Sequence, residues 1–184
     1  MKILNLHGFM GEADNKNYKA LCGLVSPDAI RSPKLDYQNS APREILDALS
    51  ALADADDCVL VGQSLGGWYA DQLSRQLHLP CILTNPCYAP HELELIAQSG
   101  IPASYTAQYR EMSPQSRNPL ALVLCSDADT LLPENMTSCT ALAQTVQRVS
   151  GSHSTIIGLQ AHLAEMLARI AGGAALPQED RMPE

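Results

Sequence analysis

The chain has 184 residues, 46% of them hydrophobic, which is enough to bury one sizeable core and too few for two ordinary domains. Its 12 basic and 20 acidic residues give a net charge of -8, which repels nucleic-acid phosphates and anionic lipid headgroups. These values favour one globular domain over residues 1–171 and argue against nucleic acid and membrane surfaces as partners.

The amino-terminal stretch MKILNLHGFM is interrupted by Asn5, His7 and Gly8, so it lacks the apolar length of a signal peptide or a membrane span. The six cysteines are scattered, with no C-x-x-C pair and no zinc-like spacing to histidine. We therefore expect a cytoplasmic protein with reduced thiols and no bound metal, present as a monomer or a weak homo-oligomer.

Short apolar runs alternate with helical patterns along the chain. Strands that alternate with helices need crossover connections, which favour a mostly parallel sheet covered by helices on both faces. The expected fold class is therefore α/β, built as a three-layer sandwich. The predicted strands are KILNL (2–6), CVLV (58–61), CILT (81–84), ALVLC (121–125) and TVQRVS (145–150), with a weaker candidate in DAIRSP (28–33).

Apolar spacing predicts a helix after residue 40. Ile45, Leu49 and Leu52 lie at i, i+4 and i+7, so they form one stripe along a helix. Ser40 and Pro42 suit the start of this helix, as a capping residue and a first helical residue.

After the strand candidate at residues 81–84, the chain contains one long insertion and, near its carboxyl end, one clear helical pattern. Residues 88–118 separate two strand candidates by more than a simple crossover needs, which indicates either a cap or lid or a surface helix with a long connection. A single apolar stripe predicts the last helix between residues 159 and 170. Residues 172–184 lose this period, and we expect a disordered tail there.

The pentapeptide Gly62-Gln63-Ser64-Leu65-Gly66 fits the pattern G-x-S-x-G, with an apolar strand before it and a helical pattern after it. So sharp a reversal forces the serine into a strained backbone conformation and exposes its hydroxyl at the carboxyl edge of the sheet. We predict that Ser64 is a catalytic nucleophile. The alternative is a glycine-rich turn that packs a helix against a strand.

A serine nucleophile needs a base, and the base needs an acid that orients it. His153 follows the last predicted strand in a Gly-Ser-rich loop, and we predict that it is the base. Two aspartates follow the preceding strand. We favour Asp129 as the acid because it stands far enough past the strand to turn back towards His153, and Asp127 is left as the alternative or as a brace of the loop.

An oxyanion is stabilised by two backbone N–H groups that point at one developing charge. The Leu65 N–H lies at a predicted helix start, where the helix dipole favours negative charge. The second donor is predicted at Phe9, because Gly8 and Gly11 allow the loop after the first strand to turn its amides inwards.

Three of the six tyrosines lie in the insertion. Their ring faces and hydroxyl edges suit a modest acyl group or an aromatic ring. We therefore expect Tyr88, Tyr105 and Tyr109 to bind the substrate, together with His7 at the exit of the first strand.

Taken together, these motifs resemble the α/β-hydrolase superfamily, and more closely the small bacterial YqiA-type esterases. The family usually has a glycine where this chain has Ala128 and an aspartate where it has Ser152. The resemblance implies a serine esterase that acts on carboxylic esters or acyl thioesters without a cofactor. The likeness covers nearly the whole ordered chain and rests on His7-Gly8-Phe9, Gly62 to Gly67 with the following Trp68-Tyr69, Asn85-Pro86, the Asp129 loop and Gly151-Ser152-His153.

Other interpretations of the same residues stay open. The same nucleophile and base serve acyltransferases and C–C bond hydrolases, since the choice of acceptor depends on pocket shape. The fold also serves as a non-catalytic binding module. A metal site built from His7, Asp127, Asp129 and His153 lacks a recognised ligand spacing. The expected function is cleavage of a small-molecule ester or thioester through an acyl-enzyme.

Overall fold

The computed structural model describes residues 1–53 and 57–173. Within these ranges, six parallel strands form one sheet in the order β2-β1-β3-β4-β5-β6. Because all six run in the same direction, their carboxyl ends meet at one edge of the sheet. The strands are β1 (Lys2–Leu6), β2 (Ile30–Arg31), β3 (Cys58–Gln63), β4 (Cys81–Thr84), β5 (Asn118–Ser126) and β6 (Ala143–Val149).

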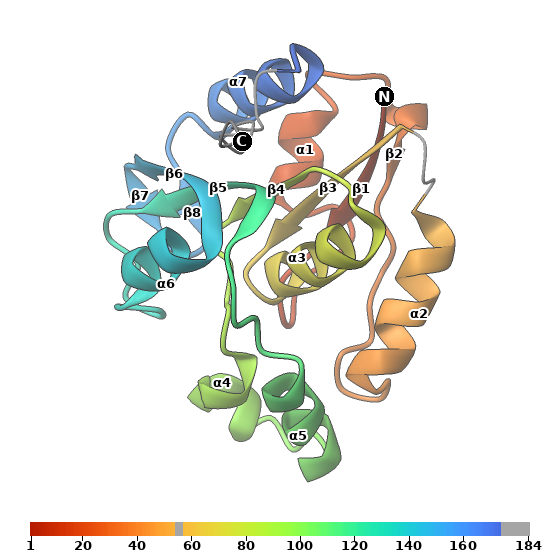
Figure 1. Cartoon of the computed structure of the whole chain (residues 1–184), viewed down its shortest axis with the longest axis vertical. Helices are drawn as coiled ribbons and strands as arrows, with labels where there is room; N and C mark the ends of the chain where they lie inside the picture. Colours follow the sequence, from red (N-terminus) through yellow and green to blue (C-terminus); the bar gives the residue numbers. More distant parts are fainter. Residues whose placement is uncertain (54–56, 174–184) are drawn as a thin grey trace, which may run out of the picture.

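Helices cover both faces of the sheet, so the molecule has three layers (Figure 1). α1 and α7 lie together on one face, while α2, α3 and α6 lie on the other. The predicted α/β fold is therefore confirmed, with a sheet that is parallel throughout. These helices are α1 (Lys16–Leu21), α2 (Pro42–Leu52), α3 (Leu65–Leu77), α6 (Asn135–Leu142) and α7 (Leu159–Ala171).

Each central strand supplies side chains to two separate hydrophobic cores. In β1, Ile3 joins the core beneath α1 and α7, whereas Leu4 and Leu6 join the core beneath α2 and α3. Both faces of the strand are thus buried, which explains why the sequence shows continuous apolar runs and not an alternating pattern.

The structure differs from the predicted elements in three places. Helix α2 is capped by Glu44, whose carboxylate accepts a hydrogen bond from the Ala41 N–H (3.0 Å), so Ser40 is not its capping residue. The weak strand candidate is only two residues long, as β2. A hairpin that was not predicted, made of β7 (Gly151–Ser152) and β8 (Thr155–Ile156), follows β6.

The segment between β4 and β5 contains the short 3-10 helix η2 (Pro90–Glu92), α4 (Glu94–Ala97) and α5 (Ala103–Glu111). In Figure 1, α4 and α5 lie at the opposite end of the molecule from α7. α5 is fixed to the body: Arg43 of α2 pairs with Glu111 (2.9 Å), and Tyr109 packs edge-on against Trp68 of α3. The lid function suggested for residues 88–118 stays a prediction.

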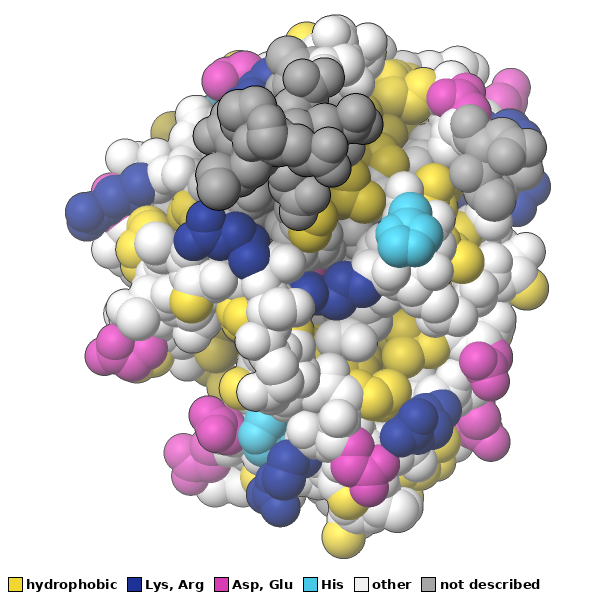
Figure 2. Space-filling model, viewed as in Figure 1, with side chains coloured by type: hydrophobic (Ala, Val, Ile, Leu, Met, Phe, Trp, Pro, Cys, Tyr) yellow, Lys and Arg dark blue, Asp and Glu magenta, His cyan; other side chains and the backbone are white. Residues whose placement is uncertain are grey.

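All six cysteines are free, and five of them are buried. No helix in the described part of the chain is long and apolar enough to cross a membrane. On the face drawn in Figure 2, acidic and basic side chains are interspersed, with apolar side chains between them. The predicted tail lies outside the described residues from position 174 onwards.

Candidate active site

Ser64 lies at the sharp turn between β3 and α3. Its φ of 52° and ψ of -117° belong to a region that residues with side chains rarely adopt. The turn also brings the start of α3 against the exit of β1, because a Cβ atom added to Gly66 would lie 2.4 Å from the carbonyl oxygens of Leu6 and His7. The strained serine and the close approach that G-x-S-x-G predicts are both present.

His153 reaches Ser64 from the hairpin that follows β6. It is the first of the two residues that connect β7 to β8, and its Nε2 lies 2.9 Å from Ser64 Oγ. Ser64 is 7% exposed and the His153 side chain 14% exposed, so this pair is shielded from bulk water but still reachable. The structure thus joins two residues that are 89 positions apart.

The acid partner of His153 in the structure is Asp129. Its Oδ2 lies 2.8 Å from His153 Nδ1, and its side chain is only 3% exposed. The other oxygen, Oδ1, accepts hydrogen bonds from the N–H groups of Leu131 and Leu132 at 3.1 Å and 2.9 Å, which fixes the carboxylate in this orientation. Asp127 instead accepts a hydrogen bond from the Gly151 N–H (3.1 Å), so it braces the loop as the alternative interpretation suggested.

The hydrogen-bond partners decide which nitrogen of His153 carries the proton. An ionised Asp129 can only accept, so the proton between them belongs to Nδ1. Nε2 is then the acceptor for the Ser64 hydroxyl. This tautomer can take the hydroxyl proton as the serine oxygen attacks a carbonyl.

The loop after β1 runs directly beside Ser64. A Cβ atom added to Gly8 would lie 3.2 Å from the Ser64 Cβ and 3.8 Å from its Oγ, so only glycine allows this approach without displacement. Among the described residues, no group accepts a hydrogen bond from the N–H of Phe9 or Leu65. Both predicted donors are therefore available to a ligand oxygen, and the Leu65 N–H also lies at the start of the 13-residue helix α3.

His7 does not lie where a substrate contact was predicted. Its ring is buried, with 1% exposure, and Nε2 accepts a hydrogen bond from the Leu35 N–H (2.8 Å) while Nδ1 donates to the Gly8 carbonyl (2.8 Å). Burial lowers the pKa of His7, with the Gly8 hydrogen bond opposing this effect. These contacts favour a role in holding the oxyanion loop over a contact with substrate.

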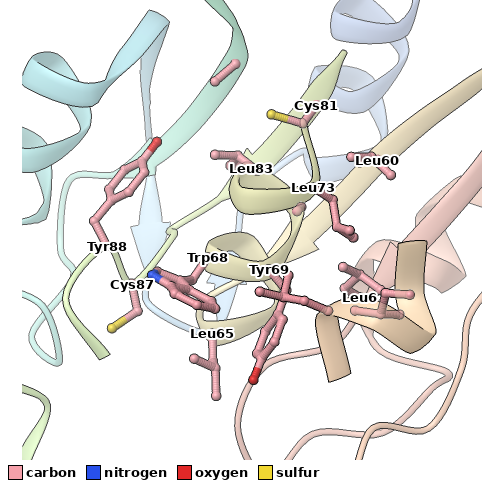
Figure 3. Close-up of a cluster of buried hydrophobic side chains, with 14 of the residues drawn as sticks. Leu6, Leu60, Leu65, Trp68, Tyr69, Leu73, Cys81, Leu83, Cys87 and Tyr88 are labelled. Carbon is pink, nitrogen blue, oxygen red and sulfur yellow. The ribbon is translucent and has the colours of Figure 1, made fainter. Parts of the chain in front are cut away.

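The three predicted substrate tyrosines occupy different environments. Tyr109 is 1% exposed, and its hydroxyl lies 2.9 Å from that of Tyr69, so it packs in the core and does not face a substrate. Tyr105 is half-buried and donates to the Asn39 carbonyl (3.2 Å). Tyr88 lines a cavity, and Figure 3 shows its hydroxyl and that of Tyr69 pointing in opposite directions. Of the three tyrosines, only Tyr88 lines the cavity next to the Ser64 backbone.

Two residues near the site were not predicted to take part in it. Tyr37 donates a hydrogen bond to the carbonyl of His7 (2.5 Å) and stacks on Tyr69. Asn85 contacts the backbone of His153, whereas the sequence marks it only as part of the Asn85-Pro86 motif. A single asparagine directly after a mostly apolar strand and before a proline was the signal available for it, because asparagine tolerates a positive φ better than most residues.

A cavity of about 240 Å³ lies between the segment after β4 and the loop that carries Asp129. Cys87 borders it, and the Cys87 N–H donates to the Ser64 carbonyl (3.0 Å), so the cavity begins next to the nucleophile's backbone. Among residues 1–53 and 57–173, no group of three or more His, Cys, Asp or Glu side chains is placed to hold a metal ion. The lining residues are Cys87, Tyr88, Ala89, Glu92, Leu93, Leu131, Leu132, Pro133, Glu134, Asn135 and Ser138.

Solved structures of other proteins share the fold of this chain. Alpha/beta hydrolase domain-containing protein 10 from mouse superposes with a TM-score of 0.67 at 15% identity, covering 95% of this chain and 90% of its own. MGS-MChE2, an alpha/beta hydrolase enzyme from the metagenome of lagoon sediments at Mar Chica, Morocco, gives 0.65 at 14% identity, with 94% and 91% covered. A Pyrobaculum calidifontis esterase gives 0.58 at 15% identity, with 95% and 76% covered.

These likenesses establish the fold. The family is established by sequence, since residues 2–170 match the model of the uncharacterised protein family UPF0227. The chain belongs to this family, and with it to the YqiA-type branch of the α/β-hydrolase superfamily.

Proposed function

We propose that the protein is a serine hydrolase that cleaves carboxylic esters or acyl thioesters through an acyl-enzyme. The observation that carries this proposal is the chain of hydrogen bonds from Ser64 Oγ through the His153 ring to Asp129, with distances of 2.9 Å and 2.8 Å. The hydrolases and the esterase that share the fold support the same chemistry. The wider hydrogen-bond geometry supports it as well, because a backbone N–H group holds the acid and the His7 ring holds the Gly8 carbonyl of the oxyanion loop.

The first half of the proposed reaction transfers the acyl group to the enzyme. Ser64 Oγ attacks the carbonyl carbon while His153 Nε2 takes the hydroxyl proton, and Asp129 stabilises the imidazolium that forms. The carbonyl oxygen becomes negative and receives hydrogen bonds from the N–H groups of Phe9 and Leu65. Each such donor typically contributes about 3 kcal/mol of transition-state stabilisation.

Collapse of this tetrahedral intermediate completes the first half, and hydrolysis of the acyl-enzyme is the second half. The imidazolium of His153 gives its proton to the departing alkoxide or thiolate, which leaves the acyl group bound to Ser64. Water then attacks the same carbonyl carbon, and His153 Nε2 takes a proton from it. Collapse of the second tetrahedral intermediate returns the proton to Ser64 Oγ and frees the carboxylic acid. No step requires a cofactor.

The cavity beside Cys87 supports a small, uncharged acyl group. Leu93, Leu131 and Leu132 give it apolar walls. Two exposed carboxylates, Glu92 and Glu134, also line it and disfavour an anionic group nearby. We therefore rank simple esters above acyl-coenzyme A thioesters, whose phosphates would approach these carboxylates and a chain of net charge -8.

The experiment compares the purified protein with Ser64→Ala, and uses Ser116→Ala at an exposed serine in the insertion as the matched control. A fluorophosphonate probe should label the wild type and Ser116→Ala but not Ser64→Ala. Hydrolysis of 4-nitrophenyl esters from acetate to octanoate should follow the same order, because the acyl-enzyme needs the Ser64 oxygen.

Undiminished ester cleavage by folded Ser64→Ala would refute the nucleophile. A wild type that neither labels nor hydrolyses any ester or thioester would favour the non-catalytic interpretation. Matched acyl-coenzyme A substrates in the same panel test the ranking, which is overturned if their kcat/KM exceeds that of the esters.

A further inference from the structure

Asn85 links the carboxyl ends of β4 and β5 to the hairpin that carries His153. It directly follows β4, and its side chain is 1% exposed. Its φ of 45° lies in the left-handed region, which asparagine adopts more readily than other residues with side chains. A buried polar side chain on a strained backbone needs contacts that compensate for both costs.

The Asn85 carboxamide makes those contacts with both of its ends. Its Oδ1 accepts a hydrogen bond from the Ser126 N–H (2.7 Å), at the last residue of β5. Its Nδ2 donates to the Ser126 hydroxyl (2.9 Å) and to the carbonyl oxygens of Ser152 (3.1 Å) and His153 (2.9 Å). One side chain therefore joins two strand ends and the β7–β8 turn.

The two hairpin carbonyls have a special position relative to His153. The Ser152 carbonyl belongs to the peptide group before the His153 Cα, and the His153 carbonyl belongs to the peptide group after it. Holding both peptide groups fixes the direction of the Cα–Cβ bond and hence the origin of the imidazole. Ser154, which follows in the turn, and Thr155, the first residue of β8, are exposed, so the carboxamide supplies a buried contact on this stretch.

We propose that Asn85 is a positioning residue that holds the His153 backbone so that the imidazole meets Ser64 and Asp129 at the same time. This rests on the proposed function, because the imidazole it positions is the proposed base. The contacts that this role requires explain why residue 85 is an asparagine. A carboxylate would place oxygen against two carbonyl oxygens, and glycine would adopt the same φ but lose every side-chain contact.

The experiment uses Asn85→Gly, which relieves the strain of the positive φ, and Asn85→Asp, which keeps the shape of the side chain. Asn118→Ala is the matched control, since Asn118 is also 1% exposed and its amide bonds to Asp71 and Ser74, away from the hairpin. We measure kcat and KM on a 4-nitrophenyl ester and the low-field proton NMR signal of the His153 Nδ1–H.

Both Asn85 variants should lose about 10²-fold in kcat, the cost of a misplacement of about 1 Å, while KM changes less than about threefold. Their low-field signal should shift or disappear, because the hydrogen bond to Asp129 is no longer held in place. Asn118→Ala should keep kcat within about threefold and keep the signal, even where its melting temperature falls.

The proposal is overturned if folded Asn85→Gly keeps wild-type kcat and an unchanged signal, or if Asn118→Ala loses as much kcat as the Asn85 variants. If Asn85→Gly does not fold, Asn85→Asp decides by the same criteria. If the wild type has no esterase activity, the proposed function fails, but the NMR signal still tests whether Asn85 holds the imidazole.

Discussion

The backbone of Ser64 adopts a conformation that costs free energy in the folded state. Its φ of 52° and ψ of -117° cost about 1 to 3 kcal/mol for a residue that carries a Cβ. The strained conformation is kept because hydrogen bonds hold the peptide groups on both sides of the Ser64 Cα. The Ser64 N–H donates to the Thr84 carbonyl (3.1 Å), and the Ser64 carbonyl accepts from the Cys87 N–H (3.0 Å). The same contacts direct the side chain towards His153.

This strain predicts opposite effects of two small substitutions. Ser64→Ala keeps the Cβ and hence the strain, whereas Ser64→Gly relieves it at an entropic cost of about 0.5 to 1 kcal/mol. We expect Ser64→Gly to be more stable than Ser64→Ala by about 1 kcal/mol in urea unfolding. Exposed Ser116, which has no positive φ, is the control, and there the glycine variant should be the less stable one. A Ser64→Gly variant that is less stable than Ser64→Ala would show that the turn stores no strain.

At the scale of elements, the loop from β5 to α6 gives its two aspartates different partners. Asp129 faces His153, whereas Asp127 Oδ1 accepts from the Gly151 N–H and its own N–H donates to the Val149 carbonyl (2.9 Å). The first is placed to orient the imidazole, and the second ties this loop to the strand before the hairpin.

Replacing each aspartate by asparagine should therefore give very different rates. Asp129→Asn favours the wrong His153 tautomer and should lower kcat by about 10⁴-fold, the loss known for this change in a serine-protease triad. Asp127→Asn keeps an oxygen for the Gly151 N–H and should retain kcat within about threefold. Steady-state kinetics on a 4-nitrophenyl ester measure both, and circular dichroism checks the fold. Comparable losses in the two variants would contradict the assignment of Asp129.

The elements also show what sequence reasoning could reach. Local patterns predicted β3, the Ser64 turn and α3, because strain and close approach are encoded within five adjacent residues. They also placed His153 and Asp129 after the correct strands. They missed the β7–β8 hairpin, whose strands have two residues each, and the Asn85 contacts, which join positions up to 68 apart. Tyr109 and His7 were expected at the substrate because residue type alone does not reveal that a polar ring is buried and bonded.

On the scale of the whole molecule, the candidate site is built from four strand ends on one edge of a parallel sheet. β1 supplies the oxyanion loop, β3 the serine, β5 the acid and β6 the hairpin with the histidine. Two apolar cores fix these ends relative to each other from opposite faces. Many of the buried polar side chains lie at or beside strand ends, where they hold loops. His7 is one of them, and its imidazole can change protonation near neutral pH.

His7 predicts a specific dependence of that stability on pH. Burial lowers its pKa in the folded state, so between that pKa and the unfolded value of about 6.5 the unfolded chain binds a proton that the folded chain does not. The contribution of the neutral His7 ring to stability is therefore fully present above the pKa of the unfolded state. As the pH falls from there to the folded-state pKa, the free energy of unfolding decreases by up to about 1.4 kcal/mol per pH unit. The structural reason is that a protonated ring would turn a donor towards the Leu35 N–H.

Urea unfolding at pH values from 8 down to 5 should show this loss in the wild type. His7→Gln can still accept from the Leu35 N–H but does not titrate, so its free energy of unfolding should fall less over the same range. His78→Asn is the matched control, because His78 is exposed and its φ of 55° suits asparagine; it should keep the wild-type slope. Equal slopes in all three proteins would mean that His7 takes up its proton in the fold as readily as in the unfolded chain, and the oxyanion loop would then not depend on a neutral ring.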